Sequence, residues 1–399
     1  IPAGTVPGEY EGTVTVKSGG EVQLTFTVRL LVVNHALPPV SEWAFHLDLW
    51  QFPFQLSGLC ADNGQKVTPF SSEYFTLVKP FYQLLADAGQ KVITAYIKDG
   101  AFNKGQTMVK WHEAADGKWS FDYTGFDKFV AQMMSWGIGR QISCFSLVGW
   151  NTSIGYTDAS GEARTLKLTV GSDEYRTVWN EFLDSFERHL KTKGWFEKTV
   201  LYMDEIREDE MRQVVSFIKQ HNPDWKIGLA GSAVSSDVES AFYDYSTILG
   251  YDRTSTNAVA TFYTSCAQSI PNAYVSLDNN PAEMVWVAWY AKAKGLNGFL
   301  RWAYDYWTKA DPQDVRDGSN TAGDFSLIYR SDNSLSSVPL SSIRLELLRE
   351  GIQDYEKMRI LSTNLMNPVV QKFTLTSGRF AGEIVTEAQG MLKKISAEY

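Results

Sequence analysis

The chain has few of the residues that build metal centres and disulfide scaffolds. Its 399 residues include three Cys and five His. Cys60, Cys144 and Cys266 are far apart, and no metal-site spacing links them. A chain of this size does not need a disulfide scaffold, so we expect buried free thiols, with the pairing of two of the three left open. We therefore expect no metal and no other cofactor.

Positive charge and long apolar runs are also scarce. Asp and Glu (46) outnumber Lys and Arg (37), and the formal net charge is −9. An acidic surface repels the phosphate backbone of nucleic acids and anionic lipid headgroups. No run approaches the about 18 apolar residues that a membrane-spanning helix needs. The composition argues against a nucleic-acid partner and against membrane insertion.

Aromatic residues, in contrast, are abundant. There are 13 Trp, 19 Tyr and 22 Phe, and several stand next to polar residues. Flat rings with polar edges suit the faces of sugars, which are apolar above and below and hydroxylated around the rim. A large core also needs big side chains. Composition alone leaves both interpretations open.

Residues 9–33 alternate as strands do. Two runs rich in Val and Thr flank Ser18-Gly19-Gly20, which predicts a β-hairpin. An isolated hairpin is only marginally stable, so it must pack on the rest of the chain or on strands further upstream. Leu37-Pro38-Pro39 then predicts a stiff linker into a new domain. No signal sequence is visible, and residues 1–4 read like the middle of a domain, as they would after processing or truncation.

After the linker, strands alternate with helices. This order predicts a parallel sheet with right-handed crossovers. No glycine-rich phosphate loop follows a strand, so an α/β fold of the (β/α)8 TIM-barrel type fits better than an open doubly wound sheet. The segment 250–258 leaves little room for a helix, and we expect the barrel to be irregular there. The candidate strands are 43–49, 92–97, 142–148, 199–205, 226–230, 246–250, 258–263 and 297–303.

Four segments show helical features most clearly. In 173–190 the apolar residues share one face, with Ser172 or Asp173 as the N-cap. For 281–294, Asn280 can cap and Pro281 takes the first helical position. The others are 342–362, interrupted by Gly351, and a closing helix over 381–396.

The carboxyl ends of barrel strands are where function collects. Here they carry carboxylates and aromatic residues without a His cluster, which favours a sugar-cleaving site. The sharpest feature is TVLYMDEIRED, in which an apolar strand runs directly into Asp204 and Glu205. Neighbouring strand residues point to opposite faces, so both acids reach one site only at the very end of the strand.

Adjacent acids cannot flank a bond as the separated carboxylates of most glycosidases do. They suit substrate-assisted catalysis instead. Glu205 would protonate the leaving oxygen, which requires a pKa raised by burial and by its acidic neighbour, and Asp204 would hold the 2-acetamido group of the substrate. The competing interpretation is a solvated acidic loop, because three more acids follow at 208–210.

The remaining candidates for chemistry are weaker. His46 lies within a strand and is best interpreted as a satisfied interior histidine. His112-Glu113 falls in a predicted loop and lacks the second His of a zinc site. The Ser and Cys residues have neither an elbow motif nor a partner His.

Several motifs in the right order resemble the catalytic domain of glycoside hydrolase family 123, the β-N-acetylgalactosaminidases and their relatives. The similarity covers nearly the whole chain, and together the motifs are specific. They are LDLWQFP (47–53), DGKWSFDYTGFDKFV (116–130), YMDEIRED (202–209), FYTSC (262–266), NGFLRWAYDYW (297–307) and SIRLELLREGIQDYE (342–356).

The resemblance implies a domain plan and a reaction. Residues 1–34 would close an N-terminal β-sandwich, 35–365 would form the catalytic barrel, and 366–399 would be a helical tail packed on it. The implied enzyme is a retaining exo-glycosidase that releases terminal β-linked N-acetylgalactosamine, or a related N-acetylhexosamine, through an oxazolinium-type intermediate. Its substrate would be a glycosphingolipid- or glycoprotein-type glycan, met in a secreted, periplasmic or outer-surface location.

The resemblance also assigns roles. Asp204 would orient and polarise the acetamido nitrogen, Glu205 would be the general acid/base, and Tyr263 would hydrogen-bond the acetamido oxygen. Trp302 would form the floor under the sugar ring. Further substrate-binding residues would be Trp150, Tyr304, Trp307 and, at the end of the first strand, Asp48.

Two departures from the family pattern leave the exact sugar open. FYTSC inserts Ser265 between Thr and Cys, and Arg301 precedes Trp302 where an aromatic residue is common. Two alternatives therefore stay open. One is a glycosidase of the same fold acting on a glycan without acetamido participation. The other is a non-catalytic carbohydrate-binding relative.

Overall fold

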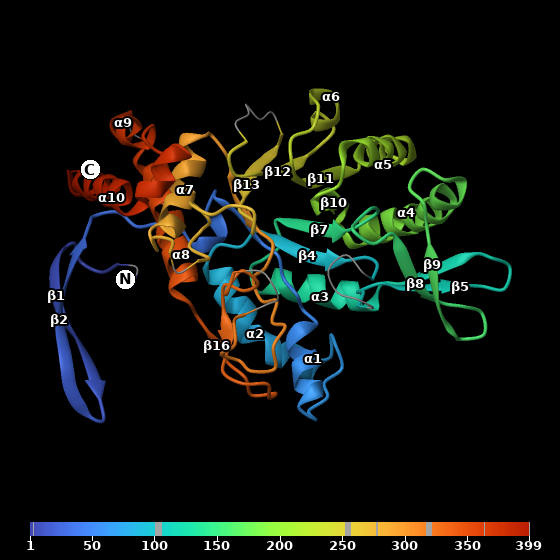
Figure 1. Ribbon diagram of the computed structural model, residues 1–399, viewed down its shortest axis with the longest axis horizontal. Helices are drawn as coiled ribbons and strands as arrows, with labels where there is room; N and C mark the ends of the chain where they lie inside the picture. The colour runs from blue at the N-terminus through green and yellow to red at the C-terminus, as the bar shows by residue number, and fades with distance from the viewer. Residues whose placement is uncertain are drawn as a thin grey trace.

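Eight parallel strands form the centre of the molecule, seen here in a computed structural model that describes residues 1–2, 4–99, 106–251, 257–276, 278–316, 321–362 and 364–398 (Figure 1). The strand order is β3-β14-β13-β12-β11-β10-β7-β4, so that strands that follow one another along the barrel are neighbours in the sheet. The strands are β3 His46–Leu49, β4 Val92–Tyr96, β7 Gln141–Phe145, β10 Thr199–Asp204, β11 Lys226–Gly231, β12 Asp244–Ile248, β13 Val259–Tyr263 and β14 Gly298–Arg301. All eight candidate strands are confirmed.

The sheet nearly closes into a barrel between β3 and β4. The backbone joins them only through a bridge between Leu47 and Gln90. Side-chain amides supply the other bonds. The Gln90 side chain accepts from the Leu49 N–H at 2.9 Å and donates to the Leu49 carbonyl at 3.1 Å, while the Thr94 N–H donates to Gln51 Oε1 at 2.9 Å. The side chains of Gln51 and Gln90 thus replace the backbone hydrogen bonds that are missing between β3 and β4. The predicted barrel is confirmed.

Helices surround this sheet. Among them are all four that the sequence predicts, and Ser172 caps the helix that begins at Asp173 by accepting from the Tyr175 N–H at 3.1 Å. The α-helices are α1 Gln55–Asp62, α2 Ser72–Asp87, α3 Thr124–Ser135, α4 Asp173–Lys193, α5 Glu208–His221, α6 Ser236–Glu239, α7 Glu283–Ala293, α8 Ile343–Leu361, α9 Asn367–Val370 and α10 Ala381–Glu398. Short 3-10 helices are η1 Val40–Glu42, η2 Phe196–Lys198, η3 Asn364–Met366 and η4 Thr376–Phe380.

The helix α7 begins two residues later than Pro281. Asn280 forms a turn in front of it instead, with its side chain accepting from the Ala282 N–H at 2.9 Å. Gly351 lies where α8 crosses α7, and a Cβ there would approach the Val285 carbonyl oxygen to 2.7 Å. The glycine that interrupts the helical pattern therefore permits the close packing of α8 on α7.

The barrel is irregular where the sequence suggests. Between β12 and β13 the described residues contain no helix, and residues 252–256 lie outside the described part of the chain. Between β11 and β12 the helix α6 has only four residues. On this side of the barrel, strands follow one another through short connections.

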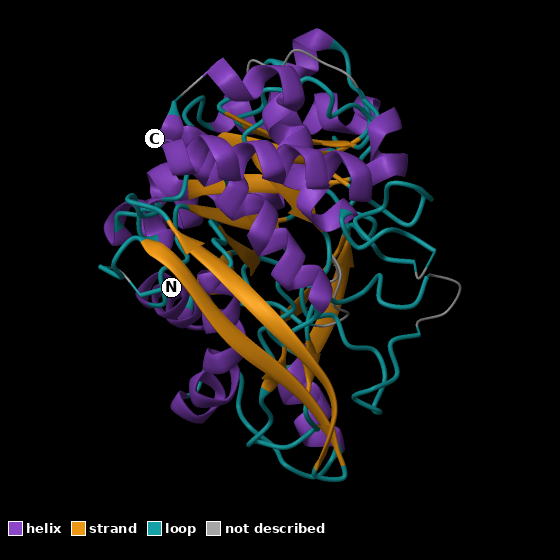
Figure 2. Cartoon of the chain, turned by 90° about the vertical axis from the view of Figure 1, so that its left-hand side faces the viewer, coloured by secondary structure: helices purple, strands orange, loops and turns teal. Residues whose placement is uncertain are grey.

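The hairpin at the start of the chain is confirmed. β1 Gly8–Ser18 pairs antiparallel with β2 Glu21–Val32, and Gly19 and Gly20 turn the chain at φ 59° and 86°, in the left-handed region that glycine tolerates. It projects from the rest of the molecule (Figures 1 and 2). One face is apolar and solvent-exposed, and it is formed by Tyr10, Val14, Val16, Leu24, Phe26, Val28 and Leu30. Packing of this face on the described rest of the chain is therefore not observed, and packing on upstream strands stays a prediction.

A second sheet of four short strands was not predicted. It has the order β6-β5-β8-β9 and follows β4 and β7 in the chain. Its strands are β5 Lys110–Glu113, β6 Trp119–Asp122, β8 Ser153–Thr157 and β9 Ala163–Lys167, and a separate two-stranded pair is β15 Tyr329–Arg330 with β16 Pro339–Leu340. His112-Glu113 lies in β5, so the prediction of a loop there is wrong. The strand is held by Trp111, whose ring stacks on Phe182 of α4 with centroids 4.7 Å apart.

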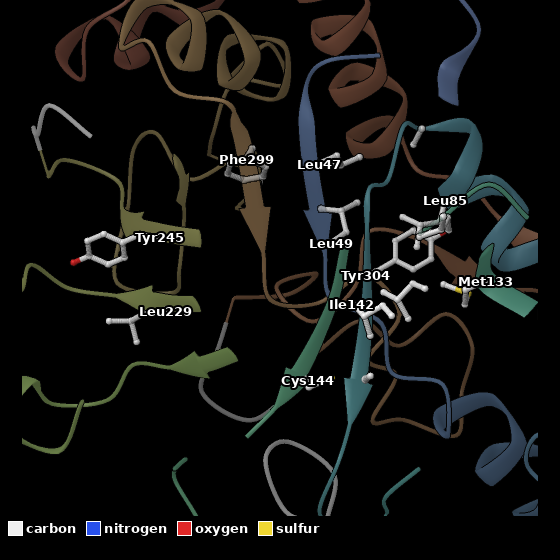
Figure 3. Packing of buried hydrophobic residues seen from close by; sticks show 14 of the residues in the cluster. Leu47, Leu49, Leu85, Met133, Ile142, Cys144, Leu229, Tyr245, Phe299 and Tyr304 are labelled. Carbon is white, nitrogen blue, oxygen red and sulfur yellow. The ribbon is translucent and has the colours of Figure 1, made fainter. Parts of the chain in front are cut away.

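Alternation along the strands divides the core in two. Outward residues such as Leu47, Leu49 and Phe299 pack against the helices in one large cluster (Figure 3). Inward residues form a smaller cluster, comprising Trp50, Phe52, Phe145, Val200, Tyr202, Ala230, Tyr263, Leu300 and Ala303. The smaller cluster fills the barrel below the strand ends.

The three cysteines are unpaired. Cys60 and Cys144 are buried, as expected, whereas Cys266 is exposed. No helix among the described residues is long and apolar enough to cross a membrane.

Candidate active site

Asp204 and Glu205 stand together at the carboxyl end of β10. Asp204 is the last residue of the strand and pairs with Ala230 of β11. The Glu205 N–H donates to the Ala230 carbonyl oxygen at 2.8 Å, but the φ of Glu205 is +49°, in the left-handed region. In an extended strand the two side chains would face opposite sides. The left-handed residue turns the chain so that both acids reach the same edge of the barrel.

The two acids differ in their exposure to solvent. Asp204 is half-buried, whereas Glu205 is exposed. Loss of solvent around the Asp204 carboxyl raises its pKa well above the usual range, and the neighbouring charge of Glu205 adds to the rise. The expectation that burial acts on Glu205 is therefore wrong, because residue 205 is exposed while Asp204, the last residue of β10, keeps the inward position.

Tyr263 brings a hydroxyl to the same point from β13. It is the last residue of that strand, is buried in the small cluster, and donates from its hydroxyl to Glu205 Oε1 at 2.9 Å. Burial and the negative charge of Glu205 raise the pKa of Tyr263, so the phenol keeps its proton. Its predicted bond to an acetamido oxygen stays a prediction.

Two tryptophans lie at the same edge. The loop after β7 carries Trp150, whose indole N–H donates to the Asp204 carbonyl oxygen at 3.2 Å. Trp302 follows β14 and packs on the small cluster, edge-on to Phe52 and Phe325 with centroids 6.0 and 4.8 Å apart. Trp302 is half-buried and Trp150 is exposed. The structure thus brings together Asp204, Glu205, Tyr263 and Trp150, with Trp302 over the same cluster as Tyr263.

Tyr304 and Trp307 are placed elsewhere. Tyr304 is fully buried in the large cluster (Figure 3), and its hydroxyl donates to the Phe81 carbonyl oxygen at 2.8 Å. The Trp307 indole is buried and donates to the Ile328 carbonyl oxygen at 2.9 Å. The prediction that they form pocket walls is corrected, because after β14 the chain packs these rings against α2 and not over the strand ends.

Asp48 also differs from its prediction. It is 1% exposed, on the inward face of β3 two residues before Trp50. Burial raises its pKa well above the usual range, and Asp244 adds to the rise. Nearby, burial lowers the pKa of His46 to about 3, so this histidine is neutral. Asp48 is therefore an interior residue of the barrel and not a substrate contact at its edge.

A buried arginine, which the sequence did not assign to the site, connects two of its loops. Arg301 is fully buried and donates to the carbonyl oxygen and hydroxyl of Thr264 at 3.0 and 2.7 Å. It also pairs with the buried Asp324. Arg301, the last residue of β14, thereby ties the chain just after Tyr263 to the segment around Asp324. The sequence did carry a sign of this role, because Arg301 ends an apolar strand at a position where the family pattern has an aromatic residue.

Asp305 should make stability depend on pH. Burial raises its pKa from 3.8 to about 7, against the opposing hydrogen bonds from the Phe52 N–H and the Tyr82 hydroxyl. The folded protein then holds a proton that the unfolded chain releases, so this contribution is full below about pH 4 and lost as pH rises to about 7. Asp305→Asn removes the titration. We expect the difference in unfolding free energy between wild type and variant to change by a few kcal/mol (order of magnitude) across this range, in favour of the variant at the higher pH.

Urea unfolding at a series of pH values measures this difference. Asp62→Asn, at the exposed end of α1, is the matched control and should follow the wild type throughout. Parallel curves for wild type and Asp305→Asn would contradict the assignment.

The side chains at the site are carboxylic acids and aromatic groups. Within the described ranges, no group of three or more His, Cys, Asp or Glu side chains could hold a metal ion. The site offers two carboxylates, a phenol and two indoles, which are groups for proton transfer and for contact with sugar rings.

Comparisons with known proteins agree with this inventory. The sequence profile of the glycoside hydrolase 123 catalytic domain matches residues 56–361. A family 123 glycoside hydrolase from Clostridium perfringens, analysed for glycolipid glycan hydrolysis, has a similar structure, with a TM-score of 0.88 and 24% identity over 100% of this chain and 77% of that one. A maltogenic α-amylase from Thermotoga neapolitana reaches only 0.41, at 11% identity over 80% of this chain and 77% of that one. No curated protein sequence matches the chain.

Proposed function

The chain belongs to glycoside hydrolase family 123, and from this premise we propose that it releases terminal β-linked N-acetylgalactosamine with retention of configuration. The observation that carries the proposal is the adjacent pair Asp204 and Glu205, with the Tyr263 hydroxyl 2.9 Å from Glu205. Adjacent acids are too close together to act from opposite sides of a glycosidic bond. Catalysis with the substrate's own acetamido group removes that requirement.

Each side chain has one task in this reaction. The Asp204 carboxylate accepts a hydrogen bond from the acetamido N–H, which makes the acetamido oxygen a better nucleophile. That oxygen attacks the anomeric carbon while Glu205 gives a proton to the departing glycosidic oxygen. The resulting oxazolinium-type ring is opened by water, from which Glu205 takes the proton back. The net configuration is retained because two displacements occur.

The surroundings support the same assignment. The half-buried, inward position of Asp204 strengthens a hydrogen bond to the substrate, since fewer water molecules compete there. The exposed position of Glu205 suits a group that must meet the leaving oxygen and later a water molecule. Trp302, packed on the cluster that holds Tyr263, supplies an apolar surface for the sugar ring.

For the natural substrate we propose a glycosphingolipid- or glycoprotein-type oligosaccharide, met outside the cytoplasm. The similar Clostridium perfringens enzyme was analysed for the hydrolysis of glycolipid glycans, which supports a substrate of this class. The acidic net charge of −9 is compatible with a neutral glycan.

Turnover of an aryl β-N-acetylgalactosaminide tests the proposal. We expect hydrolysis with retention, read by NMR of the first-formed anomer, and competitive inhibition by a thiazoline analogue of the intermediate. The gluco epimer serves as the specificity control and should react more slowly. Hydrolysis of a 2-hydroxy sugar without thiazoline inhibition would refute acetamido participation, and lasting glycan binding without any hydrolysis would refute catalysis.

A further inference from the structure

Trp150 is unlike the other tryptophans of the chain. All thirteen are described, and the other twelve are buried or partly buried, whereas Trp150 is 73% exposed. An exposed indole is unfavourable, and its cost in free energy grows with the apolar surface area that stays in contact with water. An exposed tryptophan beside a pair of catalytic acids therefore needs an explanation beyond packing.

The ring is nevertheless held in place. Its N–H donates to the Asp204 carbonyl oxygen at 3.2 Å, which fixes one edge of the indole against the end of β10. The loop that carries it is anchored by Lys98, which is 1% exposed. The Lys98 ammonium donates to the carbonyl oxygens of Asn151 and Ser153 at 2.8 and 3.1 Å, just after Trp150 in the chain.

A second bond secures the same anchor. The Asp99 side chain accepts from the Gly155 N–H at 2.7 Å, at the start of the four-stranded sheet. A Cβ on Gly155 would lie 2.7 Å from the Asp99 carboxylate, so the glycine permits this close approach and a larger residue would make the carboxylate shift. Trp150 is thus a rigid apolar surface. Such a surface can bind without losing conformational freedom of its own.

The order of strands shows which side of the acids Trp150 occupies. In the ring of eight, β7 and β13 are four positions apart and face each other across the barrel. Trp150 follows β7, and Tyr263 ends β13. A sugar held by Asp204, Tyr263 and Trp302 would lie toward β13 and β14, and the group attached to it would extend past Glu205 toward Trp150.

Building on the proposed function, we propose that Trp150 is a binding platform for the sugar on the leaving-group side of the scissile bond. Its ring would stack on the face of a pyranose attached to the released N-acetylgalactosamine. The enzyme would accordingly prefer an oligosaccharide with a second ring at this position over a glycoside with a small alkyl group. Trp150 would contribute to substrate selection without taking part in bond cleavage.

Two substrates separate this role from catalysis. A β-N-acetylgalactosaminyl-galactose disaccharide and methyl β-N-acetylgalactosaminide both have an alcohol as leaving group, but only the disaccharide has a second ring. Trp150→Ala should lower kcat/KM on the disaccharide by about tenfold more than it lowers kcat/KM on the methyl glycoside, the scale of one lost ring contact. Trp150→Phe should keep most of the disaccharide activity.

Matched variants test the supporting contacts. Phe380→Ala removes an exposed aromatic ring, 58% exposed, from the C-terminal region and should leave both substrates unaffected. Lys98→Met should lower the disaccharide rate selectively, since the platform loses its anchor; a general folding defect would instead lower both rates equally. All of these rates are measured by chromatography of the N-acetylgalactosamine that is released.

The outcomes are distinguishable from those of the proposed function. An equal loss on both substrates in Trp150→Ala, or no loss on the disaccharide, overturns the platform while the proposed reaction stands. If the wild type cleaves neither acetamido sugar, the proposed function fails, and the platform fails with it.

Discussion

Glu205→Gln should reduce kcat/KM on a β-N-acetylgalactosaminyl disaccharide by about 10²–10⁴-fold, the range that general acid catalysis contributes. A sugar hydroxyl is a poor leaving group and needs the proton as the bond breaks. An aryl glycoside leaves as a stable phenolate, so the loss on it should be smaller. Because kcat/KM reports the steps up to the first irreversible one, the comparison isolates the proton donated to the leaving oxygen.

The Glu205→Gln variant should fold as the wild type does. The carbonyl oxygen of the new side-chain amide can still accept from the Tyr263 hydroxyl, whose partner in the wild type is Glu205 Oε1. Glu210→Gln, five residues further on in α5, is the matched control and should keep wild-type activity. Equal losses on the aryl glycoside and the disaccharide would exclude Glu205 as the acid.

Asp204→Asn should lower kcat/KM on acetamido sugars by about 10²–10³-fold, the usual cost of losing one polar group that stabilises the transition state. The Asn amide nitrogen is a donor and cannot accept from the acetamido N–H, while its oxygen is a weaker acceptor than a carboxylate. On an aryl glycoside with a 2-hydroxyl in place of the acetamido group, wild type and variant should be equally slow. A loss of the same size on both sugars would show that Asp204 acts on something other than the acetamido group.

The same residue predicts a pH dependence. Loss of solvent and the charge of Glu205 raise the pKa of Asp204, so the free enzyme keeps this proton at pH values where an ordinary Asp has lost it. Only the ionised form accepts the acetamido hydrogen bond. We therefore expect kcat/KM to rise with pH on the acid side, up to the raised pKa of Asp204, and this limb to be absent from the residual activity of Asp204→Asn. An unchanged limb in the variant would assign it to another group.

The barrel could be predicted because its strands are short apolar runs at regular intervals. Each candidate strand overlaps an observed one, and parallel crossovers then leave few topologies. The four-stranded sheet escaped prediction because its strands are too short and too polar to show a period, as KWHE in β5 and WSFD in β6 illustrate. Their stability comes from contacts distant in sequence, such as Trp111 on Phe182.

Within the site, the position of the acids was predictable and their relative burial was not. An apolar strand that ends in two acids marks the edge of a barrel from sequence alone. Which acid faces inward depends on the φ angle of Glu205, which no spacing reveals. Tyr304 and Trp307 were misplaced for a similar reason. The predicted strand 297–303 ends at Arg301, so the alternation of faces stops before either residue.

At position 205 the fold and the proposed function favour different residues, because the left-handed backbone favours glycine and the reaction needs a carboxylate. A residue with a side chain costs roughly 1–2 kcal/mol in this conformation, and glycine would avoid the cost. Glycine at position 205 would therefore favour the fold but remove the side chain that we propose as the general acid. Interactions elsewhere in the barrel must offset this conformational cost at Glu205, so the protein keeps a less stable backbone conformation at the position where the site needs a carboxylate.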